Sequence, residues 1–145
     1  LWGGTLESIE TSILYGIRSG HDEARVNEMP AFGRDEILEK EQIHDVAAYV
    51  LSLSGGSAST GSAEQGATIF EEQCVACHGE GGAGNPELGA PNLTDAIWLY
   101  GGDEAAVVAS ITNSRKGVMP AWSGRLDDVV IKQLAVYVHS LGGGQ

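Results

Sequence analysis

Cys74-Val75-Ala76-Cys77-His78 is the stretch of this 145-residue chain that decides its fold. The two cysteines are three positions apart, so one helical turn presents both sulfurs to the same side, and a histidine follows directly. This spacing is that of the covalent attachment motif for a c-type haem, in which each thiol bonds a vinyl group of the porphyrin. The imidazole of His78 would then offer a nitrogen to the iron as the proximal ligand.

The same cysteine spacing also occurs in thiol redox pairs and in halves of zinc sites. A structural zinc site needs further cysteine or histidine ligands near the pair. Cys74 and Cys77 are the only cysteines, and His21, His44 and His139 lie far away in the sequence. The sequence therefore favours haem attachment, and a disulfide or dithiol pair is the main alternative.

The two methionines of the chain open matching phrases, Met29-Pro30-Ala31-Phe32 and Met119-Pro120-Ala121-Trp122. Neither methionine lies in an apolar periodic run of the kind that a core-filling methionine occupies. Met119 follows His78 by a stretch long enough to cross a haem and return on its other face. Because His/Met ligation is typical of electron-transfer haems, the sequence predicts Met119 as the sixth ligand, with plain packing as the alternative.

The chain contains two copies of one domain, and the first copy has no haem motif of its own. The matches are Leu1-Trp2-Gly3-Gly4 with Leu99-Tyr100-Gly101-Gly102, Ser12-Ile13 with Ser110-Ile111, the two methionine phrases, and Ala47 to Leu53 with Ala135 to Leu141. We expect residues 1–54 to be the C-terminal part of a first domain, residues 55–61 a flexible polar linker, and residues 62–145 a complete second domain. A shared fold without a shared site is the alternative for the first copy.

Helical periodicity and capping residues predict an all-α fold. The expected helices run from a cap at Ser62 into the haem motif, briefly after Thr94-Asp95, from Asp103-Glu104 onward, and from about Leu126 or Asp127 to Ser140. In the last of these, Val130, Leu134, Tyr137 and Val138 recur at helical spacing, and we expect Tyr137 to pack near Phe70.

Several side chains of the second copy are candidates for contact with the haem. We expect Trp98, Tyr100 and Trp122 to be walls of its pocket, because buried aromatic rings usually pack. Arg115 and Lys116 either pair with a haem propionate or are simply solvated.

Charge and hydropathy limit the classes of partner. The net charge of −12 argues against nucleic acid, which an acidic surface repels. The sequence has neither a run of about 18 apolar residues nor a signal peptide at its start. Because bacteria attach haem c outside the cytoplasm, we expect a periplasmic location and a natural start that lies outside this chain.

With the phrases Gly89-Ala90-Pro91-Asn92-Leu93-Thr94-Asp95 and Trp98-Leu99-Tyr100-Gly101-Gly102, the chain resembles subunit III of cbb3-type haem-copper oxidases, the dihaem cytochrome c subunit often called CcoP or FixP. The resemblance covers essentially every residue. It implies a class I cytochrome c fold, with one complete domain preceded by the C-terminal part of another. Cys74 and Cys77 would hold haem c, His78 and Met119 would ligate its iron, and the Pro91 carbonyl would meet the far nitrogen of His78.

The resemblance also implies a cellular role. The chain would carry one covalent haem c, and Met29 would ligate a first-domain haem that is absent from this chain and expected only in the full-length protein. It would be an electron-transfer subunit in the bacterial periplasm with no substrate chemistry of its own, held at the inner membrane by an N-terminal anchor absent here. Its partners would be the other oxidase subunits and an electron-donor cytochrome.

Two other functional classes stay open. A soluble cytochrome carrier or a dehydrogenase-linked cytochrome domain would share the same haem chemistry. A haem-based gas sensor would instead have a vacant or labile sixth position that binds carbon monoxide.

Overall fold

The computed structural model describes residues 4–142, and these residues form helices and loops without a β-strand. The helices are α1 (Leu6–Tyr15), α2 (Lys40–Leu53), α3 (Ala63–Gln73), α4 (Val75–His78), the 3₁₀ turn η1 (Glu80–Gly82), α5 (Glu104–Asn113) and α6 (Asp128–Ser140). The predicted all-α class is confirmed, whereas the sequence match that includes Leu1-Trp2-Gly3 lies outside the described residues. None of the helices in residues 4–142 is long and apolar enough to cross a bilayer.

The capping residues place three helix starts where the sequence predicts them. The Ser62 side chain accepts a hydrogen bond from the Gln65 amide at 3.3 Å, and Asp103 accepts one from the Ala106 amide at 2.9 Å. Asp127 is the N-cap residue of α6, but its side chain makes no hydrogen bond to the first turn. A short polar side chain at this position satisfies an amide that the first helical turn leaves without a partner.

The short helix predicted after Thr94-Asp95 is wrong, because residues 94–99 form a bend, irregular chain and the start of a turn. The Asn92 side chain accepts hydrogen bonds from the Thr94 amide and hydroxyl, both at 2.8 Å. The Asp95 side chain accepts one from the Ile97 amide at 2.8 Å. Such local side-chain bonds satisfy the backbone in a turn and so compete with a helix.

The chain forms two compact units that combine residues from both sequence copies. Unit 1 holds Leu1–Asn27, Pro86–Gly89 and Lys116–Gln145, and unit 2 holds Glu28–Asn85 and Ala90–Arg115. The domain boundaries predicted from the repeat do not coincide with these units and stay a prediction.

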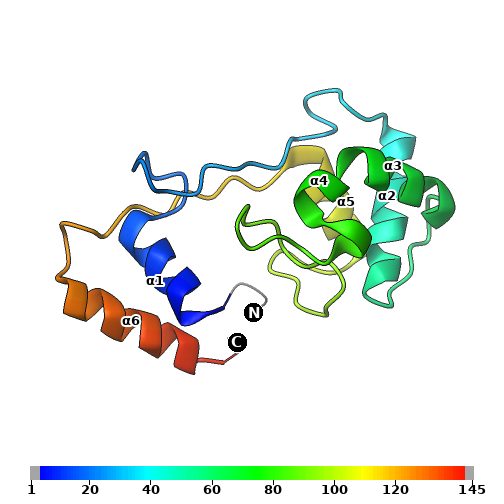
Figure 1. Cartoon of the computed structure of the whole chain (residues 1–145). Coiled ribbons are helices and arrows are strands. Elements are labelled where there is room, and N and C mark those ends of the chain that lie inside the picture. The colour runs from blue at the N-terminus through cyan, green and yellow to red at the C-terminus, as the bar shows by residue number, and fades with distance from the viewer. Residues whose placement is uncertain (1–3, 143–145) are drawn as a thin grey trace. The chain divides into compact units, whose positions relative to one another are not determined.

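In unit 2, α2 packs against both α3 and α5 (Figure 1). Its contacts bring together ten buried apolar residues from four segments of the chain: Phe32, Ile43, Val46, Ala47, Val50, Leu51, Phe70, Cys74, Val107 and Ile111. Gly66 permits the close approach of α3 to α2, since a Cβ there would clash with the Asp45 carbonyl and touch the Tyr49 side chain. We call the ten buried apolar residues around α2 the unit 2 core.

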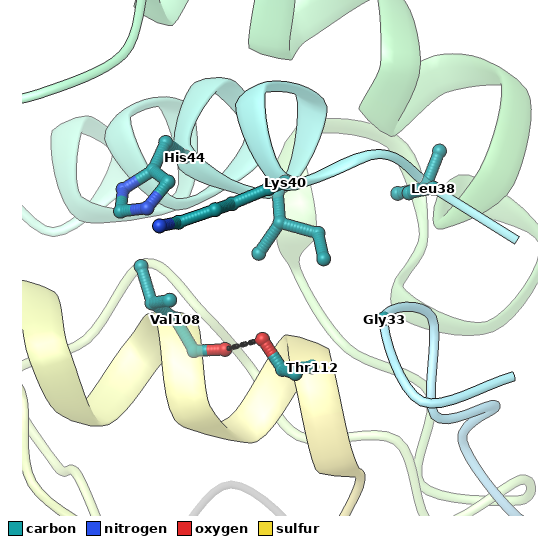
Figure 2. A pocket seen from close by; sticks show the side chains of 7 residues that line it. Gly33, Leu38, Lys40, His44, Val108 and Thr112 are labelled. Atoms are coloured by element: carbon teal, nitrogen blue, oxygen red, sulfur yellow. Dashed lines mark hydrogen bonds between the residues drawn. The ribbon is translucent and has the colours of Figure 1, made fainter. Parts of the chain in front are cut away.

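A hollow opens where the start of α2 faces α5 (Figure 2). Lys40 and His44 border it from α2, and Val108 and Thr112 border it from α5. The Thr112 hydroxyl donates to the Val108 carbonyl at 2.7 Å, so it has a partner within its own helix. The hollow does not include the cysteines of the haem motif.

In unit 1, α1 and α6 lie side by side (Figure 1). The buried residues between them are Ile13 of α1 and Ile131 and Ala135 of α6. The stripe of α6 predicted to be buried, Val130, Leu134, Tyr137 and Val138, is exposed instead.

The predicted neighbour of Phe70 is also wrong. Tyr137 is 61% exposed, and the tyrosine beside Phe70 is Tyr49 of α2, with ring centroids 5.2 Å apart. Tyr49 and Tyr137 occupy matching positions in the two sequence copies, so the periodicity identified the right position but the wrong copy.

Candidate haem-binding site

The haem motif begins at a break between α3 and α4. The Cys74 amide donates to the Phe70 carbonyl at 2.8 Å, which closes the last turn of α3. The chain then starts a single new turn, in which the amides of Cys77 and His78 both donate to the Cys74 carbonyl, at 3.1 and 2.9 Å. The motif is therefore one compact turn anchored to the end of α3.

Both cysteines are free thiols. Cys74 is buried in the unit 2 core, whereas Cys77 is exposed. Burial, with a smaller contribution from Cys77, raises the pKa of Cys74 to about 11, so this thiol is protonated at neutral pH. Neither sulfur is engaged in a disulfide.

The imidazole of His78 is oriented by a backbone carbonyl. Its Nδ1 lies 3.1 Å from the Pro91 oxygen. Because a carbonyl can only accept, Nδ1 must carry the hydrogen, and the lone pair is then on Nε2. Burial lowers the pKa of His78, while the bond to Pro91 acts in the opposite direction. The net lowering favours the neutral imidazole, the form that ligates metals.

A tight loop brings Pro91 to His78. The Gly84 amide donates to the His78 carbonyl at 2.6 Å, and the Leu93 amide donates to the Gly82 carbonyl at 2.7 Å. Gly84 has a φ of +85°, and a Cβ on it would lie 2.6 Å from the Asn92 nitrogen. Only glycine fits this crossing of the chain, which returns directly past the imidazole.

The two methionines belong to different units. Met29 belongs to unit 2, where it is partly buried against the core that contains Cys74. Met119 belongs to unit 1, where its backbone exchanges two hydrogen bonds with Ile17, both of 2.9 Å. Unit 2 therefore contains Cys74, Cys77, His78, Pro91 and Met29, and ligation by Met119 stays a prediction. Sequence reasoning did not associate Met29 with this motif.

The other predicted haem contacts have varied surroundings. Trp98 packs against the unit 2 core, while Tyr100 is exposed and lies under the Arg115 guanidinium, 4.7 Å from its ring centroid. Trp122 belongs to unit 1, and its ring centroid lies 5.9 Å from the guanidinium carbon of Arg125. Roles for these residues at a haem edge stay predictions.

The donor set fits haem c. Two free thiols on one turn can each form a thioether bond, and an imidazole whose Nδ1 is already bonded can offer Nε2 to iron. A helical fold with this turn belongs to the c-type cytochromes, which is the class that fold and site together define.

The comparisons with known proteins identify the family within that class. Residues 61–138 match the model of the family described as cytochrome c oxidase, cbb3-type, subunit III. This chain belongs to that family, and the family implies haem c as its cofactor.

Named relatives match over the whole chain. It is 60% identical to the cbb3-type cytochrome c oxidase subunit FixP of Bradyrhizobium sp. (strain ORS 278) and 58% identical to that of Azorhizobium caulinodans. It is 54% identical to subunit CcoP of Cereibacter sphaeroides. The match covers 100% of this chain and 49–50% of each relative, so the chain spans about half the length of these curated relatives.

Proposed function

We propose that this chain is an electron-transfer part of subunit III of a cbb3-type oxidase, with one haem c attached to Cys74 and Cys77. The observation that carries the proposal is the oriented imidazole of His78 on the same turn as two free thiols. The family membership and the names of the relatives support the assignment to an oxidase.

When bound, haem c supplies a redox centre that gains and loses one electron. The residues of the chain hold and tune it. Cys74 and Cys77 would hold it, His78 would offer Nε2, and the Pro91 carbonyl would keep the imidazole in one tautomer and increase its basicity. A methionine sulfur as a second protein ligand would favour the reduced form, and the family resemblance assigns that sulfur to Met119.

The chain would do no bond chemistry on a substrate. We propose that it passes electrons from a donor cytochrome toward the other oxidase subunits, in the periplasm of a bacterium and as part of a membrane-bound complex. The net charge of −12 favours a donor with a basic docking face, because opposite charges accelerate encounter.

The test is rapid mixing of the haem-loaded chain with reduced basic and acidic cytochromes, followed by haem absorbance. We expect fast reduction by the basic donor, slowed by added salt, and slow reduction by the acidic one. A haem that accepts no electron from either donor, and instead binds carbon monoxide at once when reduced, would contradict the proposal and support gas sensing.

A further inference from the structure

The segment between the two sequence copies leads from α2 into α3, and both helices belong to unit 2. Its glycine- and serine-rich composition predicts a flexible linker. Yet its first residues are tied to the end of α2, where the Gly55 amide donates to the Ser52 carbonyl at 3.1 Å and the Gly56 amide to the Leu51 carbonyl at 2.9 Å. These bonds satisfy carbonyls that the last turn of a helix leaves without a partner.

The middle of the segment is bonded to a single carboxylate. Glu104, in the first turn of α5, accepts hydrogen bonds from the Ser59 amide and the Ser59 hydroxyl, both at 2.7 Å, and from the Thr60 hydroxyl. Hydrogen bonds to an ionised acceptor are roughly twice as strong as those between neutral groups. The bonds from Thr60 and Ser59 lower the pKa of Glu104 to about 2, so the acceptor is ionised at neutral pH.

The Thr60 hydroxyl also connects this carboxylate to α2. Its oxygen lies 2.9 Å from Nδ1 of His44. A hydroxyl has one hydrogen, which Thr60 gives to Glu104, so Nδ1 of His44 must donate to the Thr60 oxygen. The result is a continuous chain of hydrogen bonds from α2, through the segment, to α5.

The last residues of the segment fix the start of α3. The Ser62 amide donates to the Asp45 carboxylate of α2 at 2.7 Å, while the Ser62 hydroxyl caps α3. Gly61 has a φ of +77°, and a Cβ on it would clash with the His44 carbonyl. Ala58 packs against the unit 2 core. Every residue from 58 to 62 therefore has a partner or a close contact within unit 2.

From these contacts we infer that residues 58–62 are a fixed strap, latched by the Glu104 carboxylate, which holds the start of α3 against α2 and α5. The haem motif follows the other end of α3, so the strap restricts how far the motif can swing away from α2. That consequence for a haem rests on the proposed function. The strap itself does not, and its test needs no haem.

Amide hydrogen exchange, measured residue by residue by NMR on the purified chain, tests the latch. We expect the Ser59 amide to exchange at least about tenfold more slowly than in an unfolded chain, and Glu104→Gln to abolish most of that protection while the Cys74 amide keeps its own. The control is Glu64→Gln, which removes the same charge from an exposed side chain in the first turn of α3. An unprotected Ser59 amide in the wild type, or equal acceleration in both variants, overturns the strap.

A pair of substitutions at Thr60 tests the hydroxyl that joins His44 to Glu104. Thr60→Val removes the hydroxyl with little change in shape, and we expect it to speed exchange of the Ser59 amide roughly fivefold. Thr60→Ser keeps the hydroxyl and should keep the protection. Equal exchange in the two variants would show that the hydroxyl does not hold the strap.

Two glycines with the same backbone conformation test the contact with α2. Gly55 and Gly61 have φ values of +80° and +77°, but a Cβ on Gly55 would meet nothing within 4 Å. Alanine at either position has the same backbone strain, so any difference reports the clash at His44. We expect Gly61→Ala to speed exchange of the Ser62 amide about tenfold more than Gly55→Ala does. Equal effects would mean that the segment does not lie on α2, and a flexible linker would then be the correct description.

Discussion

The contact between Phe70 of α3 and Tyr49 of α2 allows a quantitative test of the packing of α2 on α3 in unit 2. The two rings have centroids 5.2 Å apart and planes tilted by 58°. This is the range in which tilted aromatic pairs contribute about 0.5–1.5 kcal/mol beyond the area they bury. Phe70 is 2% exposed, so water does not weaken the contact.

The perturbation is a double-mutant cycle with Phe70→Leu and Tyr49→Leu, which keep an apolar side chain at each position. We expect a coupling free energy of about 0.5–1.5 kcal/mol, which is roughly a two- to tenfold effect on the folding equilibrium. With a urea dependence of about 1–3 kcal/mol per molar for a small protein, a coupling near 1 kcal/mol shifts the midpoint by about 0.3–1 M.

The control cycle replaces Tyr49→Leu with Tyr137→Leu. Tyr137 matches Tyr49 in the repeat but is exposed, so we expect the effects of Phe70→Leu and Tyr137→Leu to add within about 0.5 kcal/mol. Coupling of Phe70 to Tyr137 together with additivity at Tyr49 would refute the reasoning, because α6 would then cover α3.

Two further predictions concern unit 2. Hydrogen bonds donated by Thr60, and then by Ser59, lower the pKa of Glu104 to about 2 from an ordinary value near 4.5. The ionised carboxylate therefore contributes its full stabilisation above about pH 4.5, and this stabilisation is lost as the pH falls toward about 2. Urea midpoints measured down this acidic range should therefore fall less steeply in Glu104→Gln than in the wild type, and equal slopes would contradict the assignment. Ala normally stabilises a helix interior by about 1 kcal/mol over Gly, but Gly66→Ala should destabilise α3 by about 1–3 kcal/mol because its Cβ would clash with the Asp45 carbonyl. Gly117→Ala, at a position with open space, is the matched control, and a stabilised Gly66→Ala chain would show that α2 and α3 are not in contact.

Local chemistry explains which features of the fold could be predicted from the sequence. Ser62 and Asp103 begin their helices because a capping side chain acts within a few residues of itself, whereas Asp127 occupies the N-cap position of α6 without a side-chain hydrogen bond. The haem motif is equally local, since its three functional side chains share one turn. The residues 94–99 were predicted as a helix because Thr94-Asp95 resembles a cap, but the side chains of Asn92 and Asp95 satisfy local amides in turns.

The packing partner of the last helix in each sequence copy, α2 or α6, could not be predicted in the same way. Helix α6 has apolar residues on more than one face, and it buries Ile131 and Ala135 while the predicted stripe remains exposed. The two copies carry nearly the same apolar pattern, so periodicity alone cannot distinguish α2 from α6 as the cover of α3. Leu51 of α2 matches His139 of α6 in the repeat. Such a difference shows which helix covers α3 only once the contact of α2 with α3 is known. The contact of the Pro91 carbonyl with His78 was expected only from the family resemblance, because no local sequence pattern relates the two residues.

Covalent haem per chain is the measurement that tests the central claim most directly. Intact mass under denaturing conditions and pyridine haemochrome absorbance should together give one haem per chain, and Cys74→Ser/Cys77→Ser should give none. A chain that matures in a host able to attach haem c, yet carries no covalent haem, would contradict the account and return the two cysteines to thiol chemistry.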